Sequence, residues 1–462
     1  MRIQTKITVV CTLVLVLATV ALSAVLSSTS VSKASKALTY QTEQRFVGFR
    51  DVKKEQIEDY FKFIEKQVVT LSNSTMTQQA ALDFRDSFQR YSGERGQPVS
   101  NSQKGQLETY YTQQFGNKYL NLNPDSRLSP GGLYKQLDEQ GVTLQYDLIA
   151  GNPNPLGSKD ALADLNNGTT YSKHHSQYHP VYRQYLNEFG YYDIFIVDIE
   201  TGYIIYSVFK ELDFATSLLK GTYANSGIGK VFKKARSISQ HESTVTDFEA
   251  YTPSYETAAS FIASPIFDQG KATAILIFQM PVDRINEIMT YGGDWEKSGL
   301  GSSGETYLVG SDNTLRSESR FLISDKSNYL SALASSGVAS STINEINAKG
   351  VSLGLQPVDT EASRAALSGQ TGFDVILDYR GIPVYSAFTP LNIKGLNWAI
   401  LSEIDESEGL QATNELSASL RSTSIGLTML VVILGIGVVF WVGKALSKPI
   451  LAMHETVEEI SK

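Results

Sequence analysis

Apolar residues form two long, uninterrupted runs near the two ends of the chain. Residues 7–26 and residues 425–442 contain no charged side chain. Because a helix rises about 1.5 Å per residue, about 20 apolar residues reach about 30 Å, the thickness of the hydrocarbon core of a bilayer. The pattern therefore predicts two membrane-spanning helices, and residues 27–424 between them are expected outside the lipid.

Basic residues beside the two runs predict the orientation of the chain. Arg2 and Lys6 precede the first run, and Lys444 and Lys448 follow the second. Basic residues that flank membrane helices stay on the cytoplasmic side. Both ends are therefore expected in the cytoplasm and the middle region outside it. The alternative for the first run is a cleaved signal peptide, because Ala21–Ala24 loosely resembles a cleavage site.

After the first run, residues 27–91 contain no proline and follow a helical period. The apolar positions spaced 4-3-4-3 in this segment are Ile57, Phe61, Ile64, Val68 and Leu71. Such spacing is typical of one buried face of a long helix. This face packs either on the chain's own domain or on a second copy in a homodimer. Residues 92–180 are expected to form helices and loops that cap the sheet that follows.

From residue 191 the pattern changes to short β-branched and aromatic runs. The runs that predict strands are residues 191–198, 203–208, 261–267 and 272–280. Polar turns at Glu200–Gly202 and Asp268–Gly270 join them in pairs, as in hairpins. An antiparallel sheet is the expected result.

A similar succession of runs follows further along the chain. Its members are residues 305–309, 316–321, 384–391 and 398–404. Asp198 and Asp312 lie 114 residues apart (312 − 198), and Pro265 and Pro390 lie 125 apart (390 − 265). Features that recur in order at nearly constant spacing indicate a duplicated domain. The sequence therefore predicts an α+β fold, with a long N-terminal helix and two tandem antiparallel-sheet modules flanked by two transmembrane helices.

Charge and composition narrow the function classes. The net charge is −8 and the middle of the chain has no basic block, so no nucleic-acid partner is expected. The single cysteine, Cys11, lies in the first apolar run, which excludes an intramolecular disulfide. No hydrolase, zinc-protease or P-loop motif is present, so neither enzymatic activity nor a cofactor is expected.

Two short motifs each have two interpretations. Gly299–Gly304 spells G-x-G-x-x-G, but it stands before a strand instead of between a strand and a helix, so a flexible turn is favoured over a nucleotide site. His174, His175 and His179 are close enough in sequence to share a metal ion. No cysteine or carboxylate completes their ligand set, so a polar helix without metal is favoured.

The order of these elements resembles the double Cache sensor of bacterial chemoreceptors, the methyl-accepting chemotaxis proteins. The resemblance covers about residues 27–415, and residues 191–207 and 299–309 carry it most specifically. After the second apolar run, Lys448–Ile450 resembles the proline-containing start of a HAMP linker. The apolar positions that continue this helix at 3-4-3 spacing are Ile450, Met453, Val457 and Ile460.

The resemblance implies PAS-like sheet modules in a definite order. The expected segments are a cytoplasmic tail (1–6), transmembrane helix 1 (7–26), a long helix with a helical cap (27–180), a membrane-distal module (181–290), a membrane-proximal module (291–415), transmembrane helix 2 (425–442) and the start of a HAMP linker (443–462). Of the two HAMP helices, only the first is expected within this sequence.

The resemblance also implies a function. A multi-pass receptor in the bacterial inner membrane would bind a small molecule with its periplasmic region and pass a small displacement of the second span to the cytoplasm. The implied partners are the ligand, the lipid bilayer, a second copy in a homodimer and cytoplasmic signalling proteins. A chemoreceptor output is expected. The alternatives are a histidine kinase, a nucleotide cyclase or a surface adhesion protein.

The distal module is rich in tyrosine, which offers a small polar ligand both a stacking face and a hydroxyl. The candidate ligand-binding tyrosines are Tyr182, Tyr192, Tyr206, Tyr251 and Tyr255. Arg183 or Lys210 could hold a carboxylate, and Asp247 an ammonium group. In double Cache sensors of amino acids an aspartate before the returning strands binds the ammonium group, and Asp247 has a similar place. A small polar ligand such as an amino acid is therefore predicted. The alternative for each tyrosine is packing.

Overall fold

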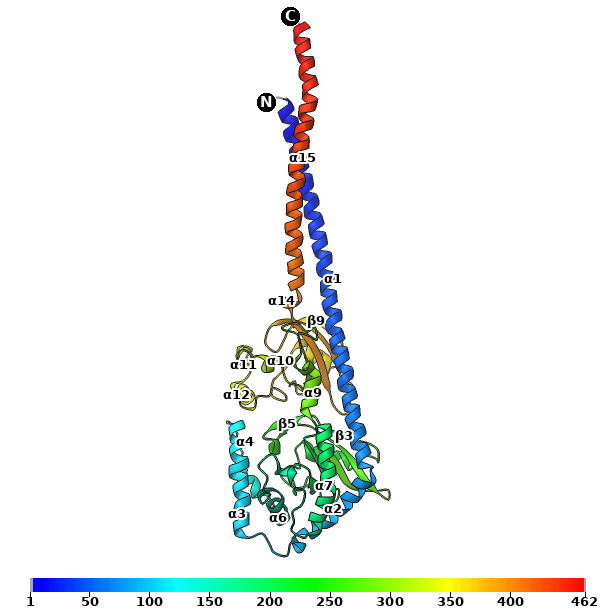
Figure 1. Cartoon of the computed structure of the whole chain (residues 1–462), viewed down its shortest axis with the longest axis vertical. Coiled ribbons are helices and arrows are strands. Elements are labelled where there is room, and N and C mark those ends of the chain that lie inside the picture. The colour runs from blue at the N-terminus through cyan, green and yellow to red at the C-terminus, as the bar shows by residue number, and fades with distance from the viewer. Residues whose placement is uncertain (1–2, 461–462) are drawn as a thin grey trace. The chain divides into compact units, whose positions relative to one another are not determined.

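The computed structural model describes residues 3–460 and contains two compact units (Figure 1). One unit is Phe46–Asp405, and the other consists of the described parts of Met1–Arg45 and Glu406–Lys462. The first helix, α1 (Ile3–Ser72), contributes to both. The chain thus has a helical unit built from its two ends and an α+β unit built from its middle.

The helical unit combines the first part of α1 with α14 (Glu406–Gly409) and α15 (Gln411–Ile460). Both long helices are apolar and long enough to cross a membrane, by length and composition. Many of their apolar side chains, such as Leu17 and Ile433, are exposed. Such a surface is expected where lipid covers a helix.

Small and hydroxylated residues lie where α1 and α15 touch within this unit. The hydroxyl of Thr428 donates a hydrogen bond to that of Ser23 (2.6 Å), and Gly435 leaves room for the side chain of Leu15. Close approach at small residues is typical of helix pairs in lipid.

The predicted HAMP start continues α15 as a helix to Ile460. The side chains of residues 446–448 and 450–462 lie outside the described ones. The apolar 3-4-3 seam therefore stays a prediction.

The structure contains a five-stranded antiparallel sheet with strand order β2-β1-β7-β6-β3, and we keep the name distal module for the region around it. Its strands are β1 (Asp193–Asp198), β2 (Ile204–Ser207), β3 (Thr244–Val245), β6 (Phe261–Asp268) and β7 (Lys271–Gln279). The strand predictions for this module are confirmed to within two residues at each end. A smaller ribbon consists of β4 (Glu249–Tyr251), the turn η4 (Thr252–Ser254) and β5 (Thr257–Ala259).

The proximal module contains a four-stranded antiparallel sheet with strand order β8-β11-β10-β9. Its strands are β8 (Glu305–Gly310), β9 (Gly372–Leu377), β10 (Pro383–Pro390) and β11 (Trp398–Asp405). The predicted β8, β10 and β11 are confirmed, and β9 is an additional strand that the sequence pattern did not indicate. Its outward positions include exposed apolar residues, which hides the usual alternation.

The first and last strands of the two sheets pair in the same way. Asp193 of β1 faces Gln279 of β7, and Glu305 of β8 faces Glu403 of β11. Equivalent residues are therefore 112 apart in the first strand (305 − 193) and 124 apart in the last (403 − 279). The first spacing differs from the predicted 114, because Asp198 is the last residue of β1 whereas Asp312 lies two residues after the end of β8.

The predicted strand over residues 316–321 is wrong. In the described chain, a single bridge between Val309 and Leu315 pairs this segment with β8. α10 (Arg320–Ser324) begins directly afterwards, and the hydroxyl of Ser319 accepts an amide hydrogen bond that caps it. The serine cap favours a helix start over continued pairing.

The predicted uninterrupted helix over residues 27–91 is also corrected. α1 ends at Ser72, and α2 (Thr75–Glu94) begins after a turn in which the amide of Asn73 donates to the carbonyl of Val69 (2.8 Å). The hydroxyl of Ser74 accepts the N–H of Thr77 and caps α2. Asn and Ser bond to nearby backbone and so interrupt a helix without any proline.

Helices surround both sheets (Figure 1). In the distal module these elements are α3 (Asn101–Thr109), η1 (Tyr110–Phe115), α4 (Gly116–Leu122), α5 (Pro130–Tyr134), α6 (Glu139–Gln145), η2 (Tyr146–Ala150), η3 (Lys159–Ala161), α7 (Thr170–Phe189) and α8 (Gly227–Ala235). The later ones are α9 (Val282–Met289), η5 (Tyr291–Gly293), α11 (Lys326–Ser335), α12 (Ser340–Lys349) and α13 (Glu361–Leu367).

Within the α+β unit, the second part of α1 lies along both sheets (Figure 1). The hydroxyl of Ser72 contacts that of Ser264 on β6 (2.9 Å), and the ring of Phe61 meets that of Trp398 on β11 edge-on. The buried residues of the predicted face are Ile57, Phe61, Ile64 and Val68. This face therefore packs on the chain's own domain. The homodimer stays a prediction.

Candidate ligand-binding site

Asp193 organises the chain that follows β2. Its Oδ1 accepts the N–H groups of Val208 (2.9 Å) and Phe209 (3.0 Å), and its Oδ2 accepts the hydroxyl of Ser207 (2.6 Å). Burial raises the pKa of Asp193 to about 7. These bonds hold a tight turn after β2. The residues that come next, 211–213, enter the interior of the distal module.

Glu211 and Asp213 are two carboxylates in this interior, and we call them the acid pair. Glu211 accepts the hydroxyl of Tyr192 (3.0 Å), and Oδ2 of Asp213 accepts the hydroxyl of Tyr251. Oδ1 of Asp213 is buried and has no hydrogen-bond partner. Burial raises the pKa of Asp213 to about 6 and raises that of Glu211 well above its ordinary value. The hydroxyl of Tyr251 offsets only part of the rise at Asp213.

A buried carboxylate oxygen without a partner is costly, because the water that it loses is not replaced. Most buried polar atoms in native proteins are hydrogen-bonded. The acid pair therefore indicates a place where a donor from outside the chain can bind.

Tyrosines surround the acid pair, and we call them the tyrosine cage. Its members are Tyr110, Tyr111, Tyr192, Tyr223, Tyr251 and Tyr255. Burial raises the pKa of each hydroxyl, and the nearby charge of the acid pair raises it further. Within residues 3–460, the hydroxyls of Tyr110, Tyr223 and Tyr255 have no hydrogen-bond partner.

The turn after β4 borders the same interior. Gln279, at the end of β7, donates its amide to the hydroxyl of Ser254 (3.1 Å), and its Oε1 is buried without a partner. Tyr255 and Glu256 follow with φ of 58° and 57°, a left-handed conformation that costs energy in residues with a side chain. This conformation stacks the ring of Tyr255 on that of Phe115, with centroids 4.9 Å apart.

Contacts from two other elements fix this turn. The amide of Asn123 donates to the carbonyl of Tyr255 (3.0 Å), and the hydroxyl of Tyr119 donates to the carboxylate of Glu256 (3.0 Å). Lys349, on α12 of the proximal module, donates to the carbonyl of Glu256 (2.8 Å). A border of the distal site is thus held partly by the proximal module.

The structure brings three of the eight predicted site residues together around the acid pair. They are Tyr192, Tyr251 and Tyr255. The first two bond to its carboxylates, and the third lies in the turn that borders it.

Four other predicted residues lie on α7 or beside it and are engaged within the chain. Arg183 pairs with Asp160 (2.7 Å), and the ammonium of Lys210 donates to the carbonyl of Val208 (2.9 Å). The hydroxyls of Tyr182 and Tyr206 bond to Thr77 and His179. The structure therefore gives these side chains roles in packing and does not place Arg183 or Lys210 as a carboxylate holder beside the acid pair.

Asp247, the predicted ammonium holder, lies away from the acid pair. Its carboxylate receives two hydrogen bonds from the guanidinium of Arg316 (2.8 and 3.0 Å) and one from the indole of Trp398 (2.9 Å). Both donors belong to the proximal module. Asp247 therefore joins the two modules, and its acceptor positions are filled.

Among the described residues, no group of three potential ligands could hold a metal ion, and the absence of a metal at the histidines stays a prediction. His175 and His179 stack at 4.4 Å, and burial lowers the pKa of His179 to about 3. At Gly299–Gly304, the carbonyl groups of Gly301 and Gly304 accept hydrogen bonds from Arg320. This turn holds an arginine.

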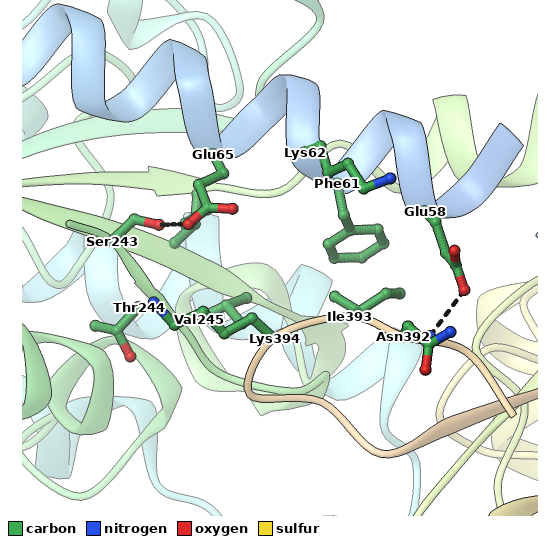
Figure 2. Close-up of a pocket in the computed structure, with 11 residues that line it drawn as sticks. Glu58, Phe61, Lys62, Glu65, Ser243, Thr244, Val245, Asn392, Ile393 and Lys394 are labelled. Atoms are coloured by element: carbon green, nitrogen blue, oxygen red, sulfur yellow. Dashed lines mark hydrogen bonds between the residues drawn. The ribbon is translucent and has the colours of Figure 1, made fainter. Parts of the chain in front are cut away.

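A second candidate is a cleft of about 240 Å³ between α1, β3 and the loop after β10 (Figure 2). Figure 2 shows the ring of Phe61 pointing from α1 into it. Its two carboxylates are already engaged, because Glu58 accepts the N–H of Asn392 (2.8 Å) and Glu65 accepts the hydroxyl of Ser243 (3.0 Å). The acid pair is therefore the stronger candidate.

Sequence reasoning missed the acid pair and Gln279. The sequence contained a local indication of the acid pair. Glu211-Leu212-Asp213 places two carboxylates shortly after a predicted strand, in a stretch that is mostly apolar. Their convergence with Tyr110 and Tyr223 had no such signal, because those residues lie about 100 positions upstream and 10 downstream.

Comparison with known protein families and with curated proteins finds no match. Similar solved structures include the ligand-binding domain of the Pseudomonas fluorescens chemoreceptor CtaA with L-leucine (14% identity, TM-score 0.29, covering 67% of this chain and 100% of that one). Others are the Pseudomonas aeruginosa amino-acid chemoreceptors PctB with L-Arg (14%, 0.30, 50% and 80%) and PctC with GABA (12%, 0.30, 64% and 99%). At this level of similarity, neither ligand nor mechanism can be transferred.

Proposed function

We propose that the chain is the sensing part of a bacterial transmembrane receptor that binds a small molecule at the acid pair. One observation carries the proposal: Oδ1 of Asp213 is buried without a partner inside a cage of tyrosines. A ligand that donates to this oxygen would complete the site and stabilise the folded protein. The two apolar helices that flank the α+β unit in sequence support a membrane location.

The finer identity that we propose is a double Cache chemoreceptor of the inner membrane. Its modules would be residues 181–290 and 291–415, and its HAMP linker would begin at residue 443. The shared strand order and register of the two sheets support a duplicated module. The homodimer, the periplasmic orientation and the chemoreceptor output belong to the same proposal, which predicts that the chain has no catalytic activity of its own.

Two contacts between the modules could transmit a conformational change from the acid pair to the proximal module. Tyr251 bonds to the acid pair and lies four residues after Asp247 (251 − 247), which is bound by Arg316 and Trp398. A ligand that moves this segment would therefore also move the proximal module. Packed interfaces of this kind switch between discrete arrangements, and the ligand would shift their populations.

Thermal unfolding of the full chain in detergent micelles, measured with a library of small metabolites, tests the proposal. At least one compound is expected to raise the melting temperature of the wild type and not that of Asp213→Asn. Glu188→Gln is the matched control, because Glu188 is an exposed acid of the same module. A compound that stabilises both variants equally would show that the acid pair is not the site.

A further inference from the structure

The charges around the acid pair are unbalanced. Titratable groups from several elements face it. They are Asp193 from β1 and Tyr192 directly before it, Tyr110 and Tyr111 from η1, Lys118 from α4, Tyr223 from the loop before α8, Tyr251 from β4, and Tyr255 and Glu256 from the turn after β4. Lys118 is the single cation in this set, and its side chain is exposed. Among the described residues, no arginine or histidine bonds to either carboxylate of the pair.

The buried lysine nearby is already used. The ammonium of Lys210 donates to the carbonyl of Val208 and is close to Asp193 and Asp160, which raise its pKa against the larger lowering effect of burial. Lys210 therefore offsets the charge of other acids. Among the described side chains, only tyrosine hydroxyls donate to Glu211 and Asp213. The backbone N–H groups of Asp213 and Phe214 also lower the pKa of Asp213, against the larger raising effect of burial.

The tyrosine cage adds a second kind of attraction for a cation. Aromatic faces attract ammonium groups electrostatically, most strongly where water is excluded. The chain itself gives an example, because the ammonium of Lys118 lies 4.4 Å from the ring centroid of Tyr255. A ligand ammonium inside the cage would meet several such faces and the unpartnered oxygen of Asp213.

We propose that the ligand is an organic cation: an amine that binds through its ammonium group and needs no carboxylate. The inference rests on the proposed function and names the ligand class for the same site. An α-amino acid would bring its carboxylate next to the buried Asp213 and the half-buried Glu211, with one exposed lysine as counter-charge. The amine that lacks this carboxylate avoids the repulsion.

Pairs that differ by one carboxylate test the inference. The probes are cadaverine and lysine, agmatine and arginine, phenethylamine and phenylalanine, and isobutylamine and valine. Binding to the full chain in detergent micelles is measured by calorimetry. At least one amine is expected to bind about 10-fold or more tightly than its parent amino acid. Its affinity should fall as the pH drops below about 6, because protonation of Asp213 removes the charge that attracts it.

Variants separate the contributions. Asp213→Asn should weaken the amine about 30-fold. Tyr110→Phe removes a hydroxyl that has no partner in the described chain, so folding is preserved and a smaller loss of about 3-fold is expected. Lys118→Gln should tighten amine binding, because this lysine competes for the face of Tyr255. Glu188→Gln should change nothing.

Three results would overturn the inference. The first is an amino acid that binds more tightly than its amine and loses affinity in Lys118→Gln. If that amino acid also loses affinity in Asp213→Asn, the sensor function and its site stand and only the ligand class is wrong. The second is the absence of binding by all four amines. The third is amine binding that neither Asp213→Asn nor Glu211→Gln weakens. This result would also show that the acid pair is not the binding site.

Discussion

The two sheet modules share a fold but treat their buried polar groups differently. In the proximal module, Glu403 accepts hydroxyls from Ser386 (2.7 Å) and Tyr307 (2.8 Å). At the equivalent position of the distal module, Oε1 of Gln279 has no partner. At this pair of equivalent positions, the side chain of Glu403 is hydrogen-bonded and Oε1 of Gln279 is not. Under the proposed function, the first module binds the ligand and the second supports it.

The modules also differ in their cations. The proximal module buries Arg316, Arg320 and Arg380, each bonded to carboxylates or carbonyl groups. The arginine Arg380 pairs with both Asp378 (2.5 Å) and Asp405 (2.6 Å). The distal acid pair has no such counter-charge, which is why a cationic ligand suits it.

The largest effect is expected where the modules meet. Arg316→Ala leaves Asp247 without its guanidinium, and loss of one partner of a buried ion pair costs about 3 kcal/mol. Urea unfolding of the full chain in micelles measures the loss. Arg364→Ala is the control, because Arg364 and Asp359 form an exposed pair and the change should cost less than about 1 kcal/mol. Equal effects of the two variants would mean that the ion pair does not tie the modules.

The pH dependence of stability should reveal the distal acids. The folded pKa of Asp213 is raised to about 6 from 3.8, so between these values the folded protein holds a proton that the unfolded chain has lost. Stability from this group is present below pH 3.8 and is lost as the pH rises through 6, by about 3 kcal/mol at most.

The pKa values of Asp193 and Glu403 are also raised, to about 7 and about 8. These two groups therefore also make the folded protein less stable as the pH rises. The difference between the urea curves of the wild type and Asp213→Asn therefore isolates Asp213. A difference that does not change between pH 4 and pH 7 would contradict the burial of this carboxylate in the folded protein.

Matched changes from acid to amide should have opposite effects on the stability of the protein in the two modules. At pH 7 without ligand, Asp213→Asn should stabilise the protein by about 1–2 kcal/mol, because it removes a buried charge from beside Glu211. Glu305→Gln should destabilise it by about 1–3 kcal/mol, because Glu305 accepts the N–H of Arg320 and the hydroxyl of Tyr379, both at 2.6 Å. Thermal unfolding checks both, and two changes of the same sign would refute the contrast between the modules.

The smallest effect is expected at the border of the distal site. Lys349→Met removes the donor to the carbonyl of Glu256 and should cost about 1 kcal/mol. Hydrogen exchange should speed up over residues 252–256, where two consecutive residues have a left-handed backbone. Unchanged exchange in this segment would show that α4 alone holds it.

Local patterns predicted the strands well because they depend on neighbours in sequence. β1, β2, β6 and β7 follow from β-branched runs separated by polar turns. The break at Asn73 and the cap at Ser319 were missed, although both are local signals, because no proline marks them. β9 was missed because its outward apolar residues hide the alternation.

The candidate site was predicted only in part. Three of the eight candidates, Tyr192, Tyr251 and Tyr255, lie around the acid pair, and their role in binding stays a prediction. Asp247 was predicted to bind the ammonium group of a ligand. In the structure it binds the guanidinium of Arg316, which lies 69 residues further along the chain. Only the meeting of the two modules decides that pairing.

The sequence by itself determined the two apolar runs, the pairs of strands and their repetition. Each depends on length, charge or a period of a few residues. The tertiary structure alone decided which acids are satisfied and which are not. Whether a buried carboxylate has a partner depends on side chains brought from distant segments, and no local pattern records that.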